Sequence, residues 1–300
     1  MTADVTSRPA RPDERKRPAP RRDPNRRRAR DLLVIVPTFA ILLVIVFPVL
    51  WMVFTSLRPT TALAARLPWS RYFDGLGFGA YSRLFGNSDF ARYIGNSLLV
   101  SAVSTVCTVV LASLAAYALS RFAFRLRRTI MMVVLATQLL PFVVLITPIY
   151  LSFGELGLLN SYVGLIIVYT AMTLPLAIYL LMGYFNTIPI ALDEAARIDG
   201  CSNVGVIFRV VFPIALPGIV TVIVTTFIAT WEEYFFASVL NTSEDLKTVQ
   251  VGLSSFFGEY TSDWGVIMAA ATVATVPTIV LFSVVQKRLV AGMAAGSVKE

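Results

Sequence analysis

Long uncharged apolar segments alternate with short polar stretches along most of this sequence. Six of the segments are about twenty residues or longer, which is the length that an α-helix needs to cross about 30 Å of hydrocarbon. Backbone groups in lipid must find partners within their own element, and these runs are continuous rather than alternating, so helices are expected. The pattern predicts an all-α membrane protein with six transmembrane helices, near residues 32–54, 93–119, 129–152, 162–183, 214–238 and 264–286. Prolines inside the segments predict kinks, at Pro141, Pro148, Pro175 and Pro277.

Composition supports the same class. The chain has 300 residues, of which 56% are hydrophobic and 15% are charged, and its mean hydropathy is +0.72. A soluble domain of this size would carry more charge on its surface. Histidine is absent, and the two cysteines, Cys107 and Cys201, fall in the second segment and in a polar gap. These counts argue against a metal site and a disulfide framework, and neither enzymatic activity nor a cofactor is expected in this chain.

Basic residues are concentrated at the N-terminus. Residues 1–30 hold eleven Lys/Arg and four Asp/Glu, together with many prolines and few apolar side chains. Such a segment cannot bury a core, so we expect a disordered basic tail at 1–30 and a transmembrane domain at 31–300. The tail is interpreted as a topological signal, which is compatible with binding to anionic lipid headgroups. No nucleic-acid partner is expected, because no folded binding module accompanies the charge. The first apolar run is too long for a cleaved signal peptide.

The distribution of charge predicts the topology. If the N-terminus is cytoplasmic, twenty of the 26 Lys/Arg residues fall on the cytoplasmic side of the six helices. This bias places both termini in the cytoplasm. The loop 55–92 is an exception, with five arginines outside, and its length predicts a small folded cap. The loop 239–263 is also predicted to lie outside.

The polar gap between the fourth and fifth segments predicts two short helices. Pro189 suits a first helical turn, and Asp193 in an early turn complements the helix dipole. Gly200 suits the left-handed position that ends a helix, so 189–199 should form about three turns. Ser202 is positioned to cap a second helix, which would run toward the fifth segment.

The first of these helices has two distinct faces. Asp193 and Arg197 are spaced to pair at i, i+4, while Ala191, Ala195 and Ile198 form a stripe on another face. The small alanines would permit close approach of a partner. Periodicity alone nevertheless favours a helix that merely connects two spans.

The spacing within the gap resembles a known signature. In permease subunits of binding-protein-dependent ABC importers, Glu-Ala-Ala is followed by three residues, Gly, nine residues and Ile-x-Leu-Pro. The matching residues are Glu194, Ala195, Ala196, Gly200 and Pro213, while Val210 and Phe212 replace the Ile and Leu. Six spans and three further stretches resemble the carbohydrate-uptake branch, most of all the smaller permease of maltose-type importers. The three stretches are Asn96-Ser97, 115–118 and 286–292.

The resemblance implies a fold and a mechanism. The fold would be a type I ABC importer permease bundle, in which coupling helices at 189–212 sit in a groove of a cytoplasmic ATPase. The chain has no Gly-x4-Gly-Lys-Ser/Thr motif, so two separate ATPase subunits would bind ATP and Mg. A second homologous permease and an extracytoplasmic solute-binding protein, which would touch the loop 239–263, complete the implied complex in the bacterial cytoplasmic membrane. The residues implied in coupling are Glu194, Ala195, Ala196, Asp199, Gly200 and Pro213.

Candidate residues for a cargo path come from polar groups within the spans. Glu232 and Glu233 lie in the fifth segment, where ionisable side chains indicate a pathway or a partner. The alternative, that both are hydrated near the outer interface, is favoured from sequence. Gln138, Asn160 and Tyr169 are weaker candidates. The cargo implied by the resemblance is a sugar or a sugar-derived solute.

Two other functions remain open at this level. A self-sufficient secondary transporter would show inverted repeats and an ionisable pair at the membrane midplane, and no clear repeat is present. A membrane scaffold that does not transport would leave the spacing from Glu194 to Pro213 unexplained.

Overall fold

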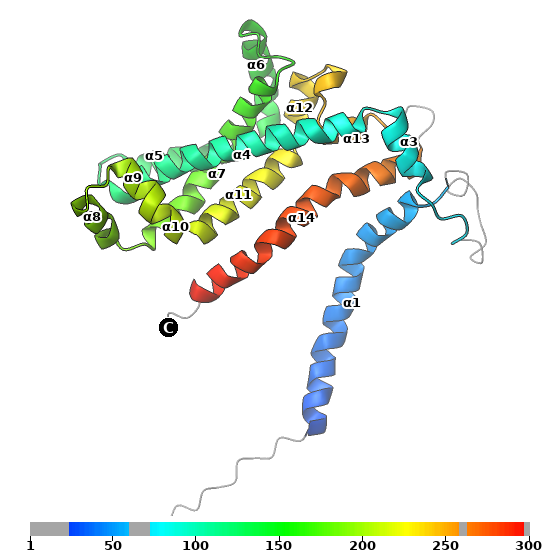
Figure 1. The fold of residues 1–300 in the computed structure, drawn as a ribbon, viewed down its shortest axis with the longest axis horizontal. Coiled ribbons are helices and arrows are strands. Elements are labelled where there is room, and N and C mark those ends of the chain that lie inside the picture. Colours follow the sequence, from blue (N-terminus) through cyan, green and yellow to red (C-terminus); the bar gives the residue numbers. More distant parts are fainter. Residues whose placement is uncertain (1–23, 60–72, 258–262, 297–300) are drawn as a thin grey trace, which may run out of the picture. The chain divides into compact units, whose positions relative to one another are not determined.

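The computed structural model describes residues 24–59, 73–257 and 263–296, with side chains described for 33–59, 73–257 and 263–286. All regular structure in these ranges is helical (Figure 1). The chain divides into two units, residues 1–51 and 52–300, which are considered separately.

The first unit contains most of helix α1 (Pro24–Ser56). Residues 24–30, predicted as part of a disordered tail, belong to this helix instead. Proline at the first helical position and the good helix formers Arg and Ala that follow explain the earlier start. The predicted tail residues 1–23 lie outside the described residues.

Within the described residues, four helices are individually long and apolar enough to cross a membrane. They lie close to the first, second, fourth and sixth predicted segments. They are Leu33–Ser56 within α1, α4 (Phe90–Arg121), α7 (Tyr162–Asn186) and Trp264–Gln286 within α14 (Trp264–Gly296). The count reaches six if each of two bent helix pairs is one span.

The third predicted segment, 129–152, is a broken helix rather than a kinked one. Its parts are α5 (Arg127–Ala136), the 3₁₀ turn η2 (Thr137–Leu139) and α6 (Phe142–Glu155). The two halves meet at 95°. Proline disfavours helical geometry in the residue before it, and Leu140 accordingly adopts an extended conformation ahead of Pro141.

The fifth predicted segment, 214–238, begins near the observed helix but extends too far at its C-terminal end. Its spanning helix is α11 (Leu216–Trp231), which meets the preceding helical run Asn203–Ile214 at 88°. After Trp231 the chain breaks and forms a separate short helix, α12 (Phe235–Leu240). Other short elements of the second unit include α3 (Gly79–Asn87), η4 (Glu244–Leu246) and α13 (Val249–Ser254).

The core of the second unit forms around α4, α7 and α11, which lie side by side (Figure 1). The buried side of α4 is rich in small hydroxyl and alanine side chains, which allow close helix approach within a membrane. Thr108 of this side shares a hydrogen bond of 2.8 Å with Thr173 of α7. The buried small residues of α4 include Ser101, Ser104, Thr108, Ala112, Ser113 and Ala116.

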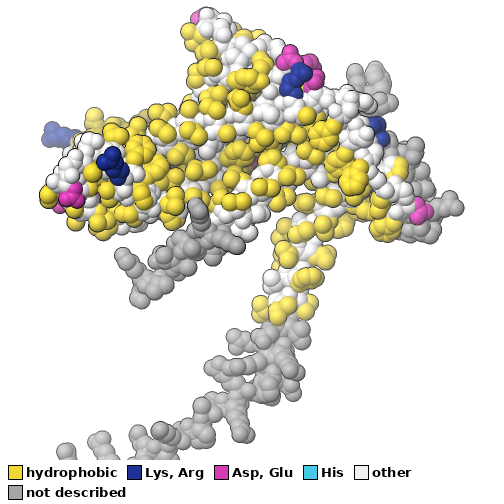
Figure 2. Space-filling view, viewed as in Figure 1, with side chains coloured by type: hydrophobic (Ala, Val, Ile, Leu, Met, Phe, Trp, Pro, Cys, Tyr) yellow, Lys and Arg dark blue, Asp and Glu magenta, His cyan; other side chains and the backbone are white. Residues whose placement is uncertain are grey.

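Hydrophobic side chains cover most of the visible surface of the second unit (Figure 2). Charged side chains in this view lie at the ends of the unit, near the gap between α7 and α11 and near α3, and around the segment that follows α12. This distribution is typical of a protein whose middle faces lipid and whose ends face water.

Close packing between α7 and α11 depends on Gly218. A Cβ atom built at this position would lie 2.3 Å from Tyr184 Cγ, the rigid base of the ring. We therefore expect Gly218→Ala to lower the free energy of unfolding by about 1–3 kcal/mol through overpacking. Thermal unfolding of the purified protein in detergent measures this loss. Gly183→Ala in α7 is the matched control, because nothing lies within 4 Å of its Cβ position. Equal melting temperatures for the two variants would contradict the packing argument.

Candidate functional site

The gap between α7 and α11 folds into helix α8 (Ile190–Ile198), with Pro189 at its N-cap. Gly200 follows at φ +86°, in the left-handed conformation predicted from the sequence. The Gly200 N–H donates to the Arg197 carbonyl at 3.0 Å, and the Cys201 N–H donates to the Ala196 carbonyl at 2.9 Å. These two bonds form a Schellman motif, which fixes the direction in which the chain leaves the helix.

A second helical run begins immediately afterwards. Ser202 caps α9 (Asn203–Val206), since its hydroxyl accepts from the Gly205 N–H at 3.1 Å, and the sequence prediction is confirmed. The run continues through a π-helical segment, η3 (Ile207–Val211), and α10 (Phe212–Ile214), which contains Pro213. The motif residues therefore fall on two helices joined by a rigid turn.

Helix α8 has one buried face and one exposed face. Asp193 and Ala196 are buried, and Ala196 joins an apolar core cluster that also contains Tyr117 and Phe185. Exposed positions on this helix include Glu194, Ala195 and Ile198, the last of which is 87% exposed, and Asp199 after it is also exposed. The stripe predicted from the sequence is thus available to a partner, whereas one of the two motif alanines packs inward.

The predicted pairing of Asp193 with Arg197 is wrong. Asp193 instead accepts from Arg121, at the end of α4, with 2.9 Å between Arg121 Nε and Asp193 Oδ2. Arg197 reaches the hydroxyl of Tyr117 at 3.4 Å. Both side chains therefore contact α4 rather than each other.

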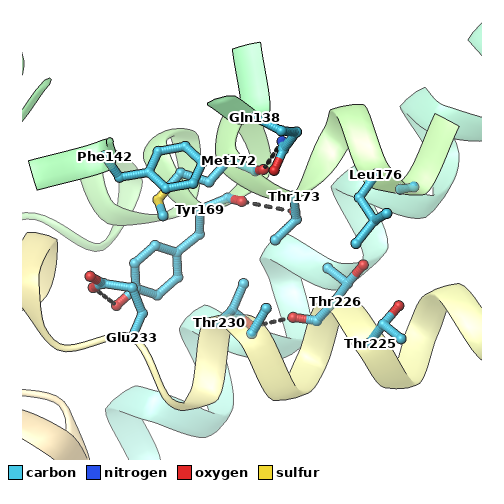
Figure 3. Close-up of a pocket in the computed structure, with 12 residues that line it drawn as sticks. Gln138, Phe142, Tyr169, Met172, Thr173, Leu176, Thr225, Thr226, Thr230 and Glu233 are labelled. Carbon is cyan, nitrogen blue, oxygen red and sulfur yellow. Dashed lines mark hydrogen bonds between the residues drawn. The ribbon is translucent and has the colours of Figure 1, made fainter. Parts of the chain in front are cut away.

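A second feature is a cavity of about 160 Å³ between α7, α11 and the break after η2 (Figure 3). It brings together Gln138, Tyr169 and Glu233, three of the residues proposed from sequence for a cargo path. The remaining lining residues are Phe142, Met172, Thr173, Leu176, Ala177, Thr225, Thr226, Ala229 and Thr230.

The two neighbouring glutamates have different environments. Glu233 lies in the break before α12, where its carboxylate accepts from the Tyr169 hydroxyl at 2.8 Å. It also accepts from the N–H groups of Phe236 and Ala237, at 2.9 and 3.1 Å. Glu232 is exposed and is not among the residues that line the cavity. Because α11 ends at Trp231, Glu232 and Glu233 point into different environments, although the sequence predicts the same role for both.

Asn160 lies elsewhere, against the segment 241–249 that follows α12. Its side-chain oxygen accepts from the Thr242 and Ser243 N–H groups, at 2.8 and 2.9 Å. Asn160 is a weak path candidate from sequence, but within the described chain it anchors this segment instead.

Asn96 is an anchor whose role the sequence did not reveal. Its amide group donates to the carbonyls of Asp245 and Lys247, each at 2.8 Å, and its oxygen accepts from the Tyr162 hydroxyl at 2.7 Å. The resemblance singled out Asn96 only as part of a motif. A polar residue at the start of an apolar span is the available signal for such a role.

The segment 241–249 carries acidic groups toward solvent. The ammonium of Lys247 hydrogen-bonds the carboxylate of Glu244, and Tyr93 donates to the same carboxylate at 2.8 Å. These two contacts, the lysine first, lower the pKa of Glu244 below its ordinary value. The group is therefore a carboxylate at neutral pH. In the described part of the chain, no three His, Cys, Asp or Glu side chains come together as a metal site would require.

Comparison with known proteins extends over most of the chain. The family model for binding-protein-dependent transport system inner membrane components matches residues 108–295. The sulfoquinovosyl glycerol transport system permease protein SmoH of Agrobacterium fabrum is 36% identical over 254 residues, 84% of this chain and 88% of that relative. The trehalose/maltose transport system permease protein MalG of Thermococcus litoralis is 32% identical, over 89% of this chain and 96% of that relative. The trehalose transport system permease protein SugB of Mycobacterium tuberculosis is 34% identical, over 84% of this chain and 92% of that relative.

A solved structure supports the fold. It is a bacterial ABC transporter involved in the import of the acidic polysaccharide alginate. One of its chains superimposes with a TM-score of 0.74 at 24% identity, over 87% of this chain and 96% of that one. The expected type I importer permease fold is confirmed.

The contacts of Glu233 predict a local stability effect. Glu233→Ala removes the acceptor of two amide groups and of the Tyr169 hydroxyl, and each buried donor left unsatisfied costs about 1–3 kcal/mol. We expect faster hydrogen–deuterium exchange across α12 and a lower melting temperature. Glu232→Ala is the matched control, and its effect should stay within about 0.5 kcal/mol because the side chain is exposed. Similar exchange in both variants would show that Glu233 does not hold α12.

Proposed function

The chain belongs to the binding-protein-dependent transport system inner membrane component family, and from this premise we propose that it forms half of the translocation path for a sugar. As a member it is a transport permease in the cytoplasmic membrane rather than an enzyme. Membership favours an importer permease over a secondary transporter or a scaffold. The observation that carries the cargo class is the agreement among relatives, which are named for sulfoquinovosyl glycerol, trehalose and maltose.

The chemistry of the cavity supports a cargo rich in hydroxyl groups. The hydroxyl groups of Thr225 and Thr230 donate to backbone carbonyls of their own helix, so toward the cavity their oxygens can only accept hydrogen bonds. Glu233 supplies only acceptors when ionised. Thr226 also lines the cavity, and its hydroxyl hydrogen-bonds no other described residue. A solute that donates several hydrogen bonds, as a sugar does, is complementary to these groups.

Energy would come from separate subunits. We place Glu194, Ala195 and Asp199 at the groove of a cytoplasmic ATPase, because they lie on the exposed side of α8 and the turn that follows it. The left-handed Gly200 then sets the angle between α8 and α9, and Pro213 precedes the bend into α11. Two ATPase subunits bind ATP and Mg, and their closure moves α8 and shifts the bundle between inward-open and outward-open states.

The remaining partners follow from the same arrangement. A second, homologous permease completes the path, since six spans are few for a whole transport channel. An extracytoplasmic solute-binding protein delivers the sugar at the side of the segment 241–249. Both termini of this permease lie in the cytoplasm.

The coupling role predicts a selective loss of function. Glu194→Lys reverses a charge on the exposed face of α8, and Gly200→Pro imposes a φ of about −65° where the chain has +86°. Both variants should insert normally and abolish uptake. Uptake of labelled sugar by whole cells, with membrane insertion checked by immunoblot, measures the two effects. Asp74→Lys, a charge reversal at another exposed position, should leave uptake unchanged. Normal uptake in both α8 variants would contradict the coupling role.

The cargo is tested with the intact complex. The permease is purified from its native membrane with its partners, reconstituted in liposomes and supplied with the solute-binding protein. ATP hydrolysis should rise with a neutral sugar and should not rise with an amino acid. Uphill transport by a preparation without any ATPase would instead establish a secondary transporter.

A further inference from the structure

A buried ion pair joins the proposed coupling helix to the bundle. Arg121 lies at the last position of α4, and Asp193 lies in the first turn of α8, 72 residues later. Their side chains are 4% and 1% exposed, so both charges lie away from water. Pulling two such groups apart would leave each charge uncompensated in a poorly solvated site. The pair therefore resists separation more strongly than an exposed ion pair would.

The guanidinium of Arg121 contacts more than the carboxylate. Its Nη2 donates at 3.1 Å to the carbonyl of Ile188, which lies between the end of α7 and the start of α8. One planar group thus joins the end of α4, the α7–α8 connection and α8 itself. Arginine suits this role because its donors are held in a fixed fork, whereas lysine presents a single point charge.

A second contact joins the same two helices one turn away from the first. Arg197, in the last turn of α8, donates to the hydroxyl of Tyr117 at 3.4 Å. Tyr117 lies one turn before Arg121 on α4, and Arg197 lies one turn after Asp193 on α8. Two contacts separated by a turn on each helix fix both the position and the angle of α8 relative to α4.

The same end of α4 is also tied to α7. Ser120 donates to the side-chain oxygen of Asn186, the last residue of α7, at 2.8 Å. Further along, Thr108 of α4 shares a hydrogen bond with Thr173 of α7, and Thr173 lines the cavity. A displacement of α8 would therefore be carried through α4 to a wall of the cavity.

We propose that Arg121 and Asp193 are positioning residues that transmit the displacement of α8 to α4, and that the importer loses coupling when their charges are removed. The proposal rests on the function proposed above, because it needs an ATPase to move α8. A purely structural role for the pair would require only that the space be filled and the charges balanced. A double variant that fills the space without charges therefore distinguishes a structural role from a role in transmission.

The deciding variant is Arg121→Leu with Asp193→Leu, which removes both charges and keeps the site apolar. Replacing a buried ion pair with apolar residues is often neutral for stability, so the complex should still assemble. The complete complex, with its ATPase, second permease and binding protein, is reconstituted in liposomes. The measurement is sugar transported per ATP hydrolysed. We expect hydrolysis to continue while this ratio falls about tenfold, within the usual range of coupling between sites.

Two further variants test whether the fork of Arg121 is required and whether the loss of any charge has the same effect. Arg121→Lys keeps the charge but loses the fork, and its ratio should also fall. Asp74→Leu removes a charge at an exposed position, and its ratio should not change. An unchanged ratio in the Arg121/Asp193 double variant, or in Arg121→Lys, would overturn the transmission role. If the unaltered complex shows no ATP-dependent uptake, the proposed function itself fails.

Discussion

A backbone amide or carbonyl without a partner in hydrocarbon costs several kcal/mol, so a spanning helix can break only where other groups satisfy its ends. Among its described residues, the second unit has two bent helix pairs and a further break between α11 and α12. Pro141 has no N–H to satisfy, and the break at Ala215 lies between Pro213 and Pro217. The third break, after Trp231, is satisfied by the Glu233 carboxylate, which accepts from the first amides of α12.

The first and third breaks also form the cavity. Gln138 and Phe142 flank the break at Pro141, and Glu233 lies in the break after α11, while Tyr169 comes from the intact helix α7. The two breaks place an amide and a carboxylate beside the hydroxyl groups that the intact helices α7 and α11 present to the same space.

Sequence periodicity was a good guide to the intact helices and a poor one to the breaks. The second, fourth and sixth segments agree with the structure within a few residues. The length of a continuous apolar helix can be read from the run of apolar residues that forms it. The 95° bend at Pro141 was expected only as a kink, since a proline does not specify how far its helix turns. Glu232 and Glu233 could not be distinguished, because their environments depend on where α11 ends.

The contacts of α8 show the same limit. Local signals identified its capping residues and its glycine, each of which acts within a few positions of the chain. The partner of Asp193 is 72 residues away, so a local rule assigned it to Arg197 by helical spacing. An acidic residue in the same register as the apolar Ala196 is the one sequence feature that indicates a buried partner elsewhere.

The coupling role proposed for α8 sets two opposing requirements. A helix that docks onto another protein must expose much of its surface, and so gains little stability from burial. A helix that transmits force must be attached firmly to the structure that it moves. Apolar contacts such as that of Ala196 are not directional, and packed helices can slide along them. Directional contacts from Arg121 and Tyr117 hold the inner face of α8 in a fixed geometry, which leaves Glu194, Ala195 and Ile198 free for a partner.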